Sequence, residues 1–200
     1  MSRRFAPVLA AASLMLAPAA AFAHAGGPSG HIHGFAAGFA HPLGGLDHVL
    51  AMVAVGLLAA EIGGRALWTV PAAFLGMMAL GGALGMAGMS APALETAIAL
   101  SVVVLGLAAS LRIPLGGAAA ATLVGFFAVF HGVAHGAEAG QGVSGLSYAG
   151  GFLLATALLH ACGLGSSLGL SRLGAQARLL PQAAAVSIAI LGVGLLAGWI

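Results

Sequence analysis

The stretch LPQAAAVSIAILGVGLLAGW, residues 180–199, carries no charged side chain. A helix that crosses a lipid bilayer needs about 20 consecutive, predominantly apolar residues, and this stretch meets that requirement. Five earlier stretches have comparable length and apolar character. The six stretches are residues 43–61, 68–87, 91–110, 114–136, 147–167 and 180–199. The sequence therefore predicts an all-α, polytopic membrane protein built as a bundle of six transmembrane helices.

The composition of the 200-residue chain excludes several other classes of protein. Hydrophobic residues make up 61% of the chain and charged residues 5%, whereas soluble domains carry about 25% charged residues. The charges are six Arg and four acids, and there is one Cys, so neither a nucleic-acid surface nor a disulfide scaffold is present. The sequence contains no GxxxxGK[ST] loop and no Lys, which excludes nucleotide hydrolysis by this chain.

The N-terminus has the pattern of a cleaved signal peptide, residues 1–23. A positive start, Arg3-Arg4, precedes an apolar region, residues 5–20, and Ala21-Phe22-Ala23 fits an A-x-A cleavage site. An uncleaved first helix is the alternative. With cleavage, the mature chain begins at His24 and its N-terminus lies outside the cytoplasm.

The arginines of the mature chain indicate its orientation in the membrane. With the N-terminus outside, the loops near residues 61–67, 110–113 and 168–180 face the cytoplasm, where positive residues accumulate. We therefore predict a bacterial inner-membrane protein with a periplasmic N-terminus. An external segment, residues 24–41, precedes the six-helix domain, residues 42–200. The four arginines all fall in the cytoplasmic loops and are Arg65, Arg112, Arg172 and Arg178.

Polar residues are rare in this chain, and eight of them are histidines. One cluster opens the first span and a second closes the fourth. Because span one enters from outside and span four returns to the outside, the two clusters lie at the same external face. The clusters are His41, Asp47 and His48, and His131, His135 and Glu138.

Helical spacing brings the side chains of each cluster together. His41 and His48 are seven residues apart, which is two turns, and they share a face if one helix begins at the proline between them. The second cluster recurs at i, i+4 and i+7 along a single stripe. Imidazole and carboxylate ligands suit Ni²⁺, Co²⁺ and Zn²⁺, so the pattern indicates a metal site. The alternative is a structural role, in which these side chains form hydrogen bonds that hold neighbouring helices together.

Two further polar residues lie inside the predicted spans. Glu95, near the external end of span three, is expected to have a partner or a function, since a carboxylate in the bilayer costs about 2.5–3.5 kcal/mol. A divalent cation would supply its countercharge and that of Asp47 and Glu138. His160 lies deeper, in span five, without a charged neighbour. A structural role and a role in the metal pathway are both open for it.

The external segment carries histidines of its own. His24, His31 and His33 could capture a metal ion before it reaches the membrane. The alternative is a mobile terminus in which these histidines have no role.

Two motifs resemble the signatures of a known family. HPLGGLDHVLAM, residues 41–52, and FHGVAHGAE, residues 130–138, resemble the two signatures of the HupE/UreJ family of bacterial nickel permeases, found with hydrogenase and urease accessory genes. The resemblance extends over the whole chain. It also matches Glu95 to an acidic residue of the family and Phe74 to an aromatic one. The functional residues that it implies are His41, Asp47, His48, His131, His135 and Glu138.

The resemblance implies a permease that takes up a divalent metal ion into the cytoplasm. The choice of nickel as the transported metal follows from the family resemblance, because these ligand types do not separate nickel from cobalt or zinc. The expected partners are the transported ion and the lipid bilayer, with no prosthetic group, and the residues select no oligomeric state. Two other classes stay open, a membrane-bound metal chaperone or sensor and an intramembrane zinc metalloenzyme. The sequence has no HExxH motif, so we predict that the protein is not an enzyme.

Overall fold

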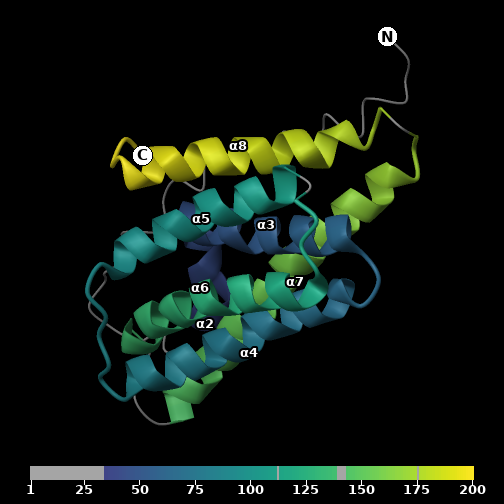
Figure 1. The fold of residues 1–200 in the computed structure, drawn as a ribbon. Helices are drawn as coiled ribbons and strands as arrows, with labels where there is room; N and C mark the ends of the chain where they lie inside the picture. Colours follow the sequence, from purple (N-terminus) through teal and green to yellow (C-terminus); the bar gives the residue numbers. More distant parts are fainter. Residues whose placement is uncertain (1–33, 112, 139–142, 175) are drawn as a thin grey trace. The chain divides into compact units, whose positions relative to one another are not determined.

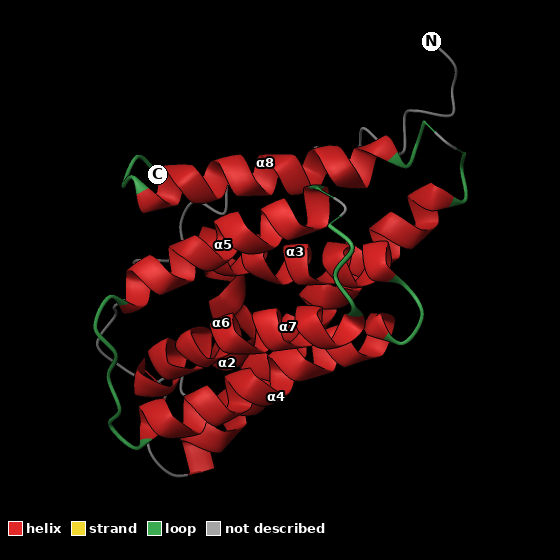
Figure 2. Ribbon diagram, viewed as in Figure 1, coloured by secondary structure: helices red, strands yellow, loops and turns green. Residues whose placement is uncertain are grey.

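The computed structural model describes residues 34–111, 113–138, 143–174 and 176–200. All regular structure in these residues is helical and none is a strand, which confirms the all-α prediction (Figure 1 and Figure 2). The expected signal peptide lies outside the described residues. The helices are α2 (Phe35–Gly44), α3 (Leu46–Ile62), α4 (Ala66–Met86), α5 (Leu94–Ser110), α6 (Gly117–Glu138), α7 (Val143–Ser171) and α8 (Leu179–Leu196).

Four of these helices, α4, α6, α7 and α8, are long and apolar enough to cross a membrane. Helices α2 and α3 meet the same condition together, although the chain bends by 87° between them. The chain is therefore a multi-pass membrane protein, with four candidate spans among its described residues, or five if the bent pair is one span. Helix α5 is shorter because it begins only after Ala93, whose φ of 59° interrupts the helical backbone. The count of six spans stays a prediction.

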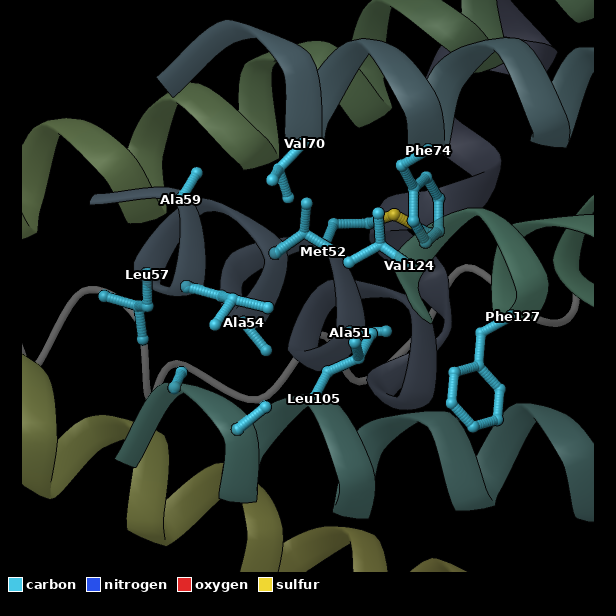
Figure 3. Packing of buried hydrophobic residues seen from close by; sticks show 14 of the residues in the cluster. Ala51, Met52, Ala54, Leu57, Ala59, Val70, Phe74, Leu105, Val124 and Phe127 are labelled. Carbon is cyan, nitrogen blue, oxygen red and sulfur yellow. The ribbon is translucent and has the colours of Figure 1, made fainter. Parts of the chain in front are cut away.

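Helix α3 lies at the centre of the bundle and contacts every other described helix. Its Ala51, Met52 and Val55 are fully buried, and Figure 3 shows Met52 next to the ring of Phe74 within this core. Large apolar side chains such as Trp68 point outward instead, as they do on a helix that faces lipid. The polar residues at the start of α3 are consequently held inside the bundle.

Helices α4 and α6 run side by side (Figure 1), and small residues line their contact. A Cβ atom at Gly81 would overlap the carbonyl of Val129, and one at Gly136 would overlap the carbonyl of Gly82. Small residues let helix backbones approach closely in lipid, where no hydrophobic force drives helices together. The contact brings the histidine-bearing end of α6 against the bundle.

The chain turns sharply at Gly45, between α2 and α3. Its extended backbone, with φ −100° and ψ 120°, ends one helix before the next begins. The expected single helix that presents His41 and His48 on one face is therefore wrong. Pro42 lies inside α2 rather than at the start of the first span, and the preceding residues are helical as well. Asp47 occupies the first turn of α3, where the helix dipole favours a carboxylate.

The polar groups gather at two opposite ends of the helices. One cavity is lined by the starts of α3 and α5 and the end of α6, and its lining includes His41, His48 and His135. Another is lined by the ends of α3, α5 and α7 and the start of α8, near Arg178. Arg65, directly before α4, and Arg172, directly after α7, lie at this same end of the bundle. The described arginines therefore lie at the end of the bundle away from the histidines.

The close contact of α4 with α6 predicts a position-specific effect of small substitutions. Gly81→Ala should destabilise the protein by about 1–3 kcal/mol, because the added methyl overlaps the Val129 carbonyl. Gly76→Ala is the matched control in the same helix, since nothing lies within 4 Å of its added Cβ. Thermal unfolding of the purified variants in detergent checks this. Equal melting temperatures for the two variants would contradict the tight packing.

Candidate metal centre

Asp47 fixes the ring of His48 within the first turn of α3. The Asp47 Oδ1 atom lies 3.0 Å from His48 Nδ1 and also accepts the backbone N–H of His48 at 2.8 Å. An ionised carboxylate accepts hydrogen bonds and cannot donate them, so the ring proton of His48 is on Nδ1. The Nε2 atom of this buried histidine therefore presents its lone pair to the interior.

Ser101 of α5 fixes the ring of His131 in the same way. Its hydroxyl donates to the carbonyl of Ile98 at 2.6 Å, so its oxygen accepts from His131 Nε2–H at 2.9 Å. The lone pair of His131 is then on Nδ1. This atom lies 3.0 Å from His48 Nε2, which also presents a lone pair.

His135 completes the group one turn further along α6. Its Nδ1 lies 3.5 Å from Glu138 Oε2, while its Nε2 contacts His48 Nε2 directly. The three rings are packed edge to face, with the centroid of His48 4.2 Å from that of His135 and 4.7 Å from that of His131. The Nδ1 atom of His131 and the Nε2 atom of His135 thus both lie against Nε2 of His48.

His48 Nε2 and His131 Nδ1 cannot satisfy each other in this arrangement, since each presents a lone pair to the other. A cation between them would be attracted to both lone pairs. Two nitrogens at about 2.0–2.1 Å from one divalent ion lie roughly 3 Å apart, the spacing of His48 Nε2 and His131 Nδ1. Metal-binding histidines typically donate their other N–H to an oxygen, as His48 and His131 do here. These two imidazoles therefore have the outer hydrogen bonds that a divalent metal ligand needs.

A second group of ligand atoms lies beside the first, toward the cavity. His41, His135 and Glu138 each offer an atom within 4.8 Å of the other two, and His41 Nε2 lies 3.1 Å from Glu138 Oε2. This group opens to a cavity of about 210 Å³, which Asp47 and Glu95 also line. His135 belongs to both groups, so an ion arriving through the cavity meets His41 and Glu138 before the buried imidazoles.

The structure brings six of the expected ligands together, three from each motif. Glu95 lines the same cavity but is exposed, in the first turn of α5, rather than deep in a span. Phe74 has no metal-binding atom and packs between His131 and His160. His160 is buried below the cluster. The capture histidines, His24, His31 and His33, lie outside the described residues.

Some residues of the site were missed by the sequence analysis. Ser101 holds His131, although a lone serine in an apolar helix carries no sequence signal for a partner 30 residues away. Phe152 of α7 lies against the cluster, its ring centroid 4.6 Å from that of His135. Tyr148, one turn earlier, lies 5.8 Å from His41. The positions of these aromatic residues, spaced four apart on a helix that follows the second motif, were the available clue.

The fold and the site define a helical, multi-pass membrane protein with a buried histidine cluster suited to a divalent metal ion. The chain belongs to the HupE / UreJ protein family, whose profile matches residues 12–195. Protein HupE of Rhizobium leguminosarum bv. viciae is 40% identical over 195 residues, which cover 98% of this chain and all of that protein. No solved structure matches the chain. The family comprises accessory proteins of metal transport rather than enzymes.

The role of Ser101 is testable by metal binding. Ser101→Ala removes the acceptor of His131 Nε2–H, so the ring loses its fixed tautomer and Ni²⁺ affinity should fall by about 10–100-fold. Ser110→Ala is the matched control, because Ser110 is also buried in α5 but its hydroxyl bonds only its own helix, at Leu107. Equilibrium dialysis of the purified proteins measures both affinities. Equal affinities in the two variants would show that Ser101 does not position His131.

Proposed function

We propose that this protein is an inner-membrane permease that takes up Ni²⁺ from the periplasm into the cytoplasm through the His48–His131–His135 cluster. One observation carries the proposal: Asp47 and Ser101 hold the N–H groups of His48 and His131, and the remaining nitrogens of these two rings lie 3.0 Å apart beside His135. The cluster is buried among the helices of a membrane domain, on the path that a transported ion would take. The family of the chain supports the same role.

The charge around the cluster favours a divalent cation as the substrate. Asp47 and Glu138 hold the rings of His48 and His135, and Glu95 lines the cavity beside them. Carboxylates near the membrane interior are stabilised by a nearby positive charge. A divalent cation bound by neutral imidazoles would supply this positive charge, so no Lys or Arg side chain is needed beside the carboxylates.

Nickel is chosen over other ions on the strength of the family. Imidazole and carboxylate ligands bind Ni²⁺, Co²⁺ and Zn²⁺ alike, with affinities that follow the same order in most proteins. The resemblance of both motifs to those of nickel permeases supports Ni²⁺ as the substrate, with Co²⁺ as the second choice. A metal chaperone or sensor would bind the same ions but would not move them.

Uptake into proteoliposomes tests the proposal directly. The purified protein should accumulate radiolabelled nickel, and Asp47→Asn, His135→Ala and Glu138→Gln should each reduce the initial rate by about tenfold or more. Protein abundance should stay near that of the wild type for Asp47→Asn and Glu138→Gln, because both keep the size of the side chain, whereas His135→Ala also removes ring contacts with His48 and Phe152. Thr122→Val, on an exposed position of α6, is the control.

The outcomes separate the candidate classes. Nickel binding by the purified protein without accumulation in the vesicles would indicate a chaperone or sensor and contradict the permease. If all three variants lose both protein abundance and nickel uptake, the role of these side chains would instead be structural, through hydrogen bonds between packed helices.

The direction of transport depends on the orientation, which cysteine labelling tests. In a Cys162→Ser background, a thiol at Met89→Cys, between α4 and α5, should react with an impermeant reagent added to the periplasmic side. A thiol at Leu173→Cys, after α7, should react only once the membrane is permeabilised. Both positions are exposed in the structure. The opposite pattern would place the histidine cluster at the cytoplasmic face and reverse the proposed direction.

A further inference from the structure

His160 of α7 is buried without a hydrogen bond. Only 2% of the residue is exposed, yet neither Nδ1 nor Nε2 has a partner. Thr156, one turn earlier and fully buried, has an unpartnered hydroxyl as well. Each unsatisfied polar group in an apolar interior costs about 1–3 kcal/mol, so two such side chains on adjacent turns indicate a ligand between or beside them.

The hydroxyl of Thr156 differs from those of other helical residues in this chain. Thr122 donates to the carbonyl of Ala118 and Ser187 donates to that of Ala183, each one turn back along its helix. This local bond is the usual way in which a helix satisfies a hydroxyl in an apolar environment. Thr156 makes no such bond. Its hydroxyl is therefore available to a ligand that the side chains around it do not supply.

Phe74 lies between this pair and the histidine cluster. Its ring centroid is 5.8 Å from that of His131 on one side and 5.1 Å from that of His160 on the other, where the rings meet edge to face. The side chain is fully buried in the core, next to Met52 (Figure 3). A single apolar ring thus separates two sets of imidazole nitrogens.

The polar face of α7 continues from His160 toward the opposite end of the bundle. Ser167 and Ser171 follow at spacings of seven and eleven residues, which place all three side chains on one side of the helix. Both serines line a cavity of about 390 Å³, together with Glu61 and Gln182. From His160 to Ser167 the helix rises about 10 Å. The carboxylate of Glu61 gives this cavity a ligand type that binds divalent ions.

We propose that Thr156 and His160 form a second binding station for the transported divalent cation, on the far side of Phe74 from the histidine cluster. The cation passes from there to the cavity lined by Ser167 and Glu61. This inference rests on the proposed function and adds a site to it. The station offers one imidazole and one hydroxyl, so the ion keeps most of its water ligands there.

Because the two sites differ in their number of ligands, the affinity for the ion decreases from the outer histidine cluster to the station. The outer cluster offers three imidazole nitrogens, whereas the station offers one. A permeation pathway needs sites that bind well enough for entry and weakly enough for release. The station therefore holds the ion only briefly, after the Phe74 ring has moved aside, and before the ion enters the wider cavity.

Two variants of the station test this inference. Thr156→Val keeps the shape of the side chain and removes only the hydroxyl, and His160→Leu replaces the imidazole by an apolar group. Each should lower the initial rate of nickel uptake into proteoliposomes by about tenfold while leaving the dissociation constant of the purified protein for Ni²⁺ within about twofold of wild type. Thr122→Val is the matched control, because that hydroxyl is satisfied within α6.

Thermal unfolding supplies a readout that separates the station from structural packing. Neither variant should be less stable than wild type, since each removes buried polar atoms that have no partner. Slower uptake with intact binding and unreduced stability supports the station. Normal nickel uptake by both variants would show that these side chains only occupy space in the core, and it would overturn the second binding station.

The remaining outcomes are also decisive. Loss of nickel binding together with uptake would place His160 and Thr156 within the outer site and overturn a separate station. Wild-type protein that binds nickel but accumulates none would refute the permease itself. In that case the proposed function fails first, and its failure is distinguished from that of the station by the wild-type measurement alone.

Discussion

Three histidine rings that contact one another inside an apolar bundle place the strongest constraint on this structure. Asp47 and Ser101 hold the rings of His48 and His131 by hydrogen bonds, and Glu138 Oε2 lies 3.5 Å from Nδ1 of His135. These oxygens come from three helices, so the helices have to meet at one depth. The bend at Gly45 and the close contact of α6 with α4 both serve that meeting. The packing of the bundle is therefore inseparable from the geometry of the histidine cluster.

The two ends of the bundle differ in chemistry, and the difference suits vectorial movement of a cation. The end with the histidine cluster combines neutral nitrogens with carboxylates and lacks arginine among the described residues. At the other end, the cavity holds Glu61 together with Arg178, whose Nε donates to the carbonyl of Ser171 at 3.4 Å. On the proposed route, a cation would be bound most tightly beside the imidazoles, and less tightly in the cavity where Arg178 accompanies Glu61.

The sequence predicted the helices well and their junctions poorly. Runs of apolar residues identify helices in lipid because the backbone has no other way to satisfy its hydrogen bonds. The run at 91–110 misled at its start, since the left-handed backbone of Ala93 delays α5. The bend after α2 was missed because Pro42, a residue typical of helix starts, lies inside the helix here. Ser101 could not be predicted as a positioning residue, because its partner, His131, depends on how α5 and α6 pack.

The apolar ring of Phe74 explains how a route with polar stations can stay closed to other ions. A continuous polar path from the cluster to the inner cavity would admit water and protons along with the metal. Apolar constrictions exclude water, and they open only when side chains move. Phe74 is fully buried between His131 and His160, so the polar groups on its two sides are separated by a single side chain. On the proposed route, passage would require the ion to displace this ring, which would limit transport to ions that the outer imidazoles bind well enough to accumulate beside it.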